Sequence, residues 1–153
     1  MLSEGGPEAR VYSPSSDPTR TLHETLGLAV FGVTALRLLW RAFDVRPLPA
    51  PMPTWMRLAS LLLQGALYLL LVLVPLAGMF GAWLEGHAVT LAFGDIPAWF
   101  PASHPLGLLV SDVHTLLGNL IIWAAAAHAG AALFHHFVLK DGVLMSMLPG
   151  RSE

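Results

Sequence analysis

The sequence predicts an all-α integral membrane protein with three transmembrane helices. Of its 153 residues, 55% are hydrophobic and only 12% are charged, whereas about a quarter of the residues in soluble domains are charged. Three segments are mostly apolar, at roughly 22–42, 56–84 and 108–139, and about 20 such residues suffice to cross a bilayer. No strand pattern is visible, and backbone groups in hydrocarbon need partners within their own segment, so helices are expected throughout.

The rest of the chain is expected to be short tails and loops around one membrane domain. Residues 1–21 are polar and rich in Pro, Ser and Gly, without the basic start and apolar core of a signal peptide. The membrane domain is expected to cover residues 22–148 and a C-terminal tail residues 149–153. Within the second span, Pro75 and Gly78 are expected to bend the helix.

Basic residues are distributed unevenly, and this predicts an orientation. Six of them lie around the first linker or after the third span: Arg37, Arg41, Arg46, Arg57, Lys140 and Arg151. Residues 58–139 contain no Lys or Arg. Because cytoplasmic loops carry an excess of Lys and Arg, the first linker and the C-terminus are expected in the cytoplasm. The N-terminus and the loop between the second and third spans are then expected outside.

Composition also limits the chemistry. The net charge of −2 gives no indication of a nucleic-acid partner. The absence of cysteine excludes disulfides, thiolate metal sites and iron–sulfur clusters with all-Cys ligation. A bound metal or cofactor must therefore be held by His, or else by Met or the carboxylates.

Two histidines are predicted to share one site near the outer face. His23 begins the first span and His114 lies at the same level in the third. Two imidazoles on separate helices can bind one haem iron from opposite sides, which gives a b-type haem suited to electron transfer. Each histidine is followed four residues later by a glycine on the same helix face, Gly27 and Gly118, which leaves room for a flat macrocycle. The alternative is that each imidazole makes an ordinary hydrogen bond between helices.

A second site is predicted at an inner level. His128 lies 14 residues after His114, which places both on one helix face about 21 Å apart. The small residues around it suit either a second haem or close helix packing. Arg37 lies 14 residues after His23 and could pair with a haem propionate. No second histidine is found on another span to oppose His128.

The remaining histidines are assigned weaker roles. His135 and His136 are expected at the inner interface, in contact with headgroups or propionates. His87 and His104 are expected to be solvated in the outer loop.

These residues resemble the bacterial cytochrome b561 family, within the group that includes the cytochrome b subunits of nickel–iron hydrogenases. The resemblance covers about residues 20–150. The first span carries H-x3-G-x9-R-x3-R, formed by His23, Gly27, Arg37 and Arg41. The second carries Y-x6-P-x2-G, formed by Tyr68, Pro75 and Gly78. The third carries H-x4-N-x8-H-x6-HH-x3-KD-x2-L-x2-M-x-P, from His114 to Pro149.

The resemblance implies that the three spans belong to a four-helix haem-binding bundle in the bacterial inner membrane. Members carry two haems b and pass electrons between a periplasmic donor and the quinone pool, and some oxidise superoxide. It implies that His23 and His114 ligate the outer haem, and that His128 ligates the inner haem with a histidine of the family's first helix. That helix is not found here, and the chain is expected to begin in the loop after it. A homodimer or another membrane subunit could supply the missing partner.

Two functions remain open from the sequence. One is a membrane b-type cytochrome that relays electrons from an unknown outer donor to ubiquinone in the lipid bilayer, with superoxide as one candidate donor. The other is a non-catalytic subunit that anchors or assembles a larger redox complex. A His-lined metal transporter is disfavoured by the scarcity of carboxylates inside the predicted spans. Superoxide is disfavoured because the outer loop offers acids and His, with Arg20 beside His23 as the obvious cation.

Overall fold

Three long helices and a small β-hairpin make up the part of the chain that the computed structural model describes, residues 17–43 and 53–141. The helices are α1 (Pro18–Phe43), α2 (Thr54–Leu84) and α3 (His104–Phe134), and α3 continues into a π-helical turn, η2 (His135–Leu139). The hairpin strands are β1 (Val89–Leu91) and β2 (Gly94–Ile96). All three helices are long and apolar enough to cross a membrane, which confirms the predicted membrane fold. The predicted tails and the first linker, with Arg46 and Arg151, fall largely outside the described residues.

Two helices begin one turn earlier than their predicted spans, which start at 22 and 108. The carboxylate of Asp17 accepts a hydrogen bond of 2.9 Å from the backbone N–H of Thr19, as an N-terminal cap does. The helix α3 carries Pro105 in its first turn, where a missing N–H is harmless. Hydropathy detects the apolar part of a helix, so these polar first turns escape it. The helix α2 runs continuously through Pro75, and the expected bend stays a prediction.

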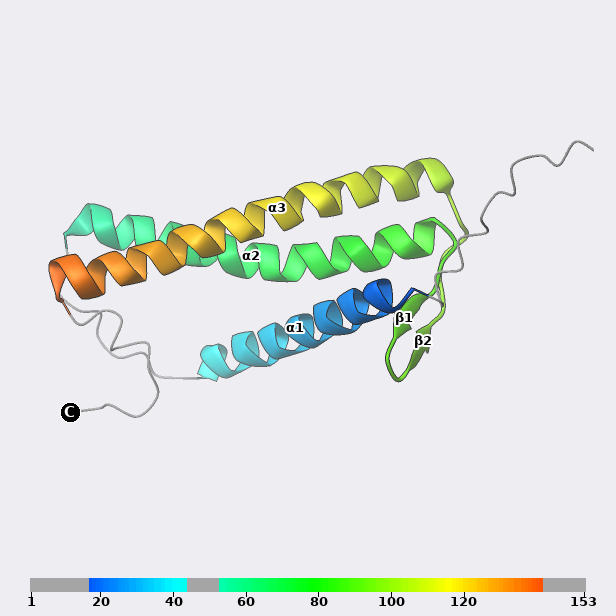
Figure 1. Ribbon diagram of the computed structural model, residues 1–153, viewed down its shortest axis with the longest axis horizontal. Coiled ribbons are helices and arrows are strands. Elements are labelled where there is room, and N and C mark those ends of the chain that lie inside the picture. The colour runs from blue at the N-terminus through cyan, green and yellow to red at the C-terminus, as the bar shows by residue number, and fades with distance from the viewer. Residues whose placement is uncertain (1–16, 44–52, 142–153) are drawn as a thin grey trace, which may run out of the picture.

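The helices leave most of their apolar surface outside the bundle. The helix α2 packs along α3, and α1 packs against α2 and β1 (Figure 1). The buried core of the described residues is small, with Trp83, Val89 and Leu91 at its centre. Large apolar side chains point outward along the helices, among them Leu36 at 68% and Trp123 at 74% exposed. Such a surface is unsuited to water and matches a lipid environment.

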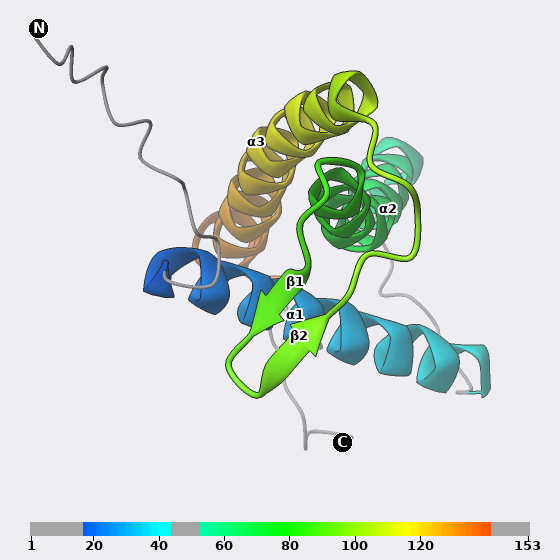
Figure 2. The same cartoon turned by 90° about the vertical axis from the view of Figure 1, so that its right-hand side faces the viewer.

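The loop between α2 and α3 folds into the hairpin, so the expectation of helices throughout is wrong here. The strands are antiparallel, and Thr90 pairs with Asp95. The backbone N–H of Thr90 donates to the carboxylate of Glu24, and the N–H of Ala92 donates to the Thr25 hydroxyl at 3.0 Å. Both acceptors belong to α1, so the hairpin lies across the first turns of that helix (Figure 2).

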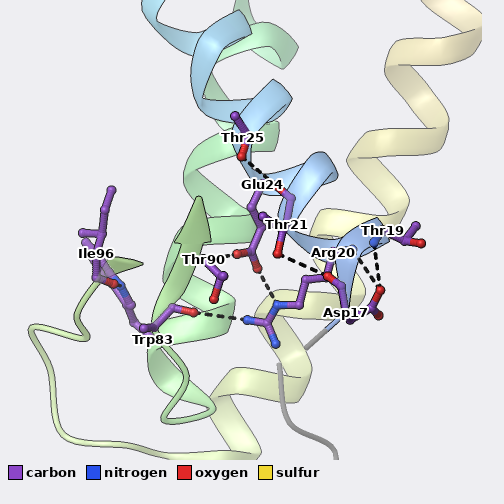
Figure 3. Close-up of polar contacts among 10 residues, drawn as sticks. Asp17, Thr19, Arg20, Thr21, Glu24, Thr25, Trp83, Thr90 and Ile96 are labelled. Atoms are coloured by element: carbon purple, nitrogen blue, oxygen red, sulfur yellow. Dashed lines mark hydrogen bonds and ion pairs between the residues drawn. The ribbon is translucent and has the colours of Figure 1, made fainter. Parts of the chain in front are cut away.

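Aromatic side chains attach the other side of the hairpin to α2. The indole N–H of Trp83 donates to the Ile96 carbonyl at 3.4 Å, and its ring stacks on Trp99 with centroids 5.4 Å apart. The same region of polar contacts is drawn in Figure 3. We call this end of the bundle the hairpin end, and the opposite end, where α1 stops and α2 begins, the linker end.

Candidate functional site

The structure brings the imidazoles of His23 and His114 together near the hairpin end. Their ring centroids lie 5.9 Å apart, and the ring planes are nearly perpendicular at 88°. A ligating imidazole nitrogen lies about 2 Å from its metal, with the ring centre roughly 1 Å farther away, so two opposed ligands place their centroids about 6 Å apart. The observed separation therefore suits two imidazoles on opposite sides of one metal ion.

The helix α2 orients the His114 ring. Its Nδ1 lies 2.9 Å from the carbonyl oxygen of Val74. A carbonyl oxygen only accepts, so Nδ1 must carry the proton, which leaves the Nε2 lone pair available for a metal. A hydrogen bond of this kind is the usual means by which a protein sets the tautomer of a ligating histidine.

A glycine of α2 makes room for this ring. A Cβ atom at Gly78 would lie 2.9 Å from Cε1 and 3.1 Å from Nδ1 of His114, which is closer than side-chain atoms approach. Gly27 and Gly118 were predicted to leave room for a flat macrocycle, and an added Cβ at either position meets nothing within 4 Å. Gly27 lines the same cavity as the two histidines. The sequence singled out Gly78 as a bend-former beside Pro75 and as part of the Y-x6-P-x2-G motif, but not as a contact of His114.

A cavity of about 370 Å³ surrounds the two imidazoles. Its walls are mainly apolar, from residues such as Leu28, Phe31 and Met79. The polar or charged side chains that line it are Arg20, His23, Glu24, Glu85, His87, Ser111 and His114. His87 was expected to be solvated, but it is partly buried in this wall. An apolar cavity with a few convergent polar groups is typical of a cofactor site.

The charges around the cavity are partly compensated. Arg20 Nε contacts a carboxylate oxygen of Glu24 at 2.6 Å, one helical turn away (Figure 3). The hydroxyl of Ser111 donates to the carboxylate of Glu85 at 2.8 Å. Two carboxylates and one guanidinium thus lie at the hairpin end of the site. Sequence reasoning missed Glu85 and Ser111, because only the packing of α2 on α3 brings them together.

His128 lies in a second cavity of about 410 Å³, between α3 and the first turns of α2. The wall from α2 includes Trp55, Ala59 and Leu63. The other histidine of this wall is His135, which contacts the carboxylate of Asp141. Among the described residues, both histidines of this cavity come from one helix, so they do not oppose each other across a metal.

Arg37 and Arg41 converge on one tyrosine of α2. The Nε–H of Arg37 donates to the Tyr68 hydroxyl at 3.0 Å. The guanidinium of Arg41 lies over the Tyr68 ring, 5.5 Å from its centroid. Both arginines therefore contact the Tyr68 side chain, rather than a carboxylate of the described residues.

Comparisons with known proteins agree on one family. A family model described as prokaryotic cytochrome b561 matches residues 4–150. Cytochrome b561 homolog 1 of Escherichia coli is 29% identical over 150 residues, which cover 94% of this chain and 85% of the relative. A probable superoxide oxidase, CybB, of Yersinia pestis is 31% identical over 93% of this chain and 82% of its own length.

A third relative is cytochrome b562 of Cereibacter sphaeroides, 37% identical over 85% of this chain and 68% of the relative. The match to the family model runs through all three helices and both cavities. The chain therefore belongs to the prokaryotic cytochrome b561 family, which implies a bacterial membrane protein with b-type haem that works in electron transfer.

Proposed function

We propose that this protein carries electrons between a donor at the outer face of the inner membrane and the quinone pool, through a b-type haem held by His23 and His114. The observation that carries the proposal is the pair of imidazoles whose centroids lie 5.9 Å apart on two helices. When bound, the haem supplies one-electron redox chemistry, and bis-His ligation leaves no iron position for oxygen. The hairpin end then faces outward, with ubiquinone as the acceptor.

The residues around the pair fit such a group. His114 presents Nε2 because its Nδ1 bonds the Val74 carbonyl, and Gly78 accepts the ring edge-on. Gly27 and apolar side chains of α1 and α2 line the space beside the imidazoles. The hydrogen bond and the α2 contact hold the His114 ring in place, which lowers the reorganisation that accompanies a change of charge.

The inner level is proposed to hold a second haem with His128 as one ligand. Small residues of α3, such as Gly130 and Ala131, line the cavity with it. Within the described residues an opposing histidine on another helix is absent. We propose that a helix of another copy or of another membrane subunit supplies it.

The charges at the hairpin end favour a neutral or cationic electron donor. Glu24 and Glu85 line the cavity, and the guanidinium of Arg20 is engaged with Glu24. An anionic donor gains little steering from such a mouth. Superoxide remains a second candidate because the Yersinia pestis relative is described as a probable superoxide oxidase.

The test is a haem-to-protein ratio on the detergent-purified chain, together with a dithionite-reduced minus oxidised spectrum. We expect a b-type spectrum from the parent chain. The variants His114→Ala and His23→Ala should each lose the haem of the outer site and its part of the spectrum. The matched control is His104→Ala, which changes an exposed histidine at the first position of α3. A purified chain without haem, from cells that make it, would leave the anchoring subunit as the function.

A further inference from the structure

A cluster of hydrogen-bond donors lies inside the membrane-spanning part of the bundle. It consists of Arg37 and Arg41 on α1 and Tyr68 on α2, joined by the hydrogen bond of 3.0 Å and the guanidinium–ring contact of 5.5 Å. Tyr68 lies near the middle of α2. Arg37 lies six residues before the end of α1, which corresponds to about 9 Å of helix. Arg37 and Tyr68 thus lie within the apolar length of their helices, and Arg41 lies in the last turn of α1.

The donors of this cluster outnumber its acceptors. A guanidinium donates only, and a tyrosine that accepts one hydrogen bond still has its own O–H to donate. After the Arg37–Tyr68 bond is formed, the terminal N–H groups of both guanidiniums and the Tyr68 O–H remain. In residues 17–43 and 53–141 the ion pairs join Arg20 to Glu24 and His135 to Asp141, so neither arginine of the cluster is neutralised by a carboxylate there.

Charge without a counter-charge is unfavourable at this depth, and intramembrane arginines usually have a partner. Planar, forked guanidiniums match the oxygens of carboxylates and phosphates. We propose that Arg37, Arg41 and Tyr68 form a binding site for an anionic oxygen group, a carboxylate or a phosphate. Arg37 and the Tyr68 hydroxyl donate to its oxygens, and Arg41 completes the charge balance while it stays stacked on the ring.

Two sources can supply that group. The first is the propionate of a haem held at the level of His128, and this source rests on the proposed function. Helices α1 and α3 both start at the hairpin end (Figure 1). Arg37 follows His23 by 14 residues, and His128 follows His114 by 14 residues. Because His23 and His114 lie together, Arg37 and His128 are expected at about the same depth in the membrane. The second source is the phosphate of an anionic lipid, and it is independent of haem.

The experiment compares Arg37→Gln, Arg41→Gln and Tyr68→Phe with Arg57→Gln in the purified holoprotein. Arg57 lies in the first turn of α2, 11 residues before Tyr68, so it controls for the loss of one positive charge. Native mass spectrometry measures binding of phosphatidylglycerol, with phosphatidylcholine as the reference lipid. A redox titration of the same samples measures the midpoint potential of each haem. Tyr68→Phe keeps the ring beneath Arg41, so it is the variant that disturbs folding least.

A lipid phosphate predicts that the three cluster variants lose phosphatidylglycerol binding by about tenfold or more, the effect of a lost charge-assisted hydrogen bond, with the potentials unchanged. A haem propionate predicts unchanged lipid binding and a lower potential of one haem, because a nearby cation favours the reduced form. The proposal is overturned if the cluster variants match Arg57→Gln in both measurements. A chain without haem would defeat the proposed function, while the lipid measurement would still decide this site.

Discussion

The substitution Gly78→Ala tests whether α2 sets the geometry of His114, the proposed haem ligand. The added methyl group would lie 2.9 Å from Cε1 of His114, whereas ordinary contacts begin at 3.4 Å. The ring must therefore retreat by about 0.5 Å, against a close-packed surrounding. The retreat also weakens the hydrogen bond of 2.9 Å to the Val74 carbonyl, because Val74 and Gly78 lie on the same face of α2.

The expected magnitude follows from three effects. Overpacking costs about 1–3 kcal/mol, and loss of the hydrogen bond costs about 0.5–1.5 kcal/mol. Replacing a helical glycine by alanine returns about 1 kcal/mol. The net loss of about 0.5–3.5 kcal/mol corresponds to haem binding that is weaker by roughly twofold to a few hundredfold.

The assay is reconstitution of the apoprotein with haem, followed by Soret absorbance, and Gly65→Ala is the matched control. Gly65 lies on the same helix, and a Cβ there meets nothing within 4 Å. The control should bind haem as the parent does and be equally or more stable, because it gains helix propensity without a clash. If Gly78→Ala binds haem with the affinity and spectrum of Gly65→Ala, the contact between His114 and α2 does not position the ligand.

Three further substitutions test the packing that holds the site. Replacing Glu24 by Ala leaves the N–H of Thr90, 8% exposed, without its acceptor. It should destabilise the protein by about 1–3 kcal/mol in detergent unfolding. Glu24→Gln keeps one of the two acceptor oxygens, which bind Arg20 and Thr90, and should recover only part of this loss. A Cβ at Gly107 would lie 3.0 Å from the backbone nitrogen of Glu85. Gly107→Ala should therefore lower the free energy of unfolding by about 1–3 kcal/mol in the same assay. An unchanged stability would show that α3 can move away from α2. Trp83→Phe removes the hydrogen bond from the indole N–H to the Ile96 carbonyl of the hairpin. It should lower stability by about 1 kcal/mol, seen as faster protease cleavage in the hairpin. Unchanged cleavage would show that this hydrogen bond does not hold the hairpin in place.

The membrane fold and the His23–His114 pair were predictable because both depend on regularities along single helices. Hydropathy over about 20 residues locates a span, and equal depth on two helices places two imidazoles at one level. The hairpin was not predictable. Its strands have three residues each, and Glu24 binds it from 66 positions away in the sequence.

The close contact between α2 and the His114 ring was not predicted. Sequence periodicity relates positions within one helix. It therefore indicated Gly27 and Gly118 as room for a macrocycle, but it could not indicate that Gly78 of α2 meets the His114 ring. Which faces of two helices meet depends on their rotation and crossing angle, and one sequence contains no direct record of either. The same reason explains why the Ser111–Glu85 hydrogen bond and the Arg37–Tyr68 hydrogen bond escaped prediction.

The hydrogen bond from His114 to the Val74 carbonyl bears on the redox potential that the proposed haem would have. A carbonyl acceptor makes the opposite ring nitrogen a more basic ligand, and ligand basicity is one of the properties that set a haem potential. The acceptor here belongs to the backbone, which every amino acid supplies equally. A change of side chain at position 74, which lines the cavity, would therefore leave the electronic effect of this hydrogen bond on the proposed ligand in place. Substitutions of the side chain at position 74 would not reveal the effect of this carbonyl. A change in the path of the α2 backbone, such as one caused by replacing Pro75, would reveal it.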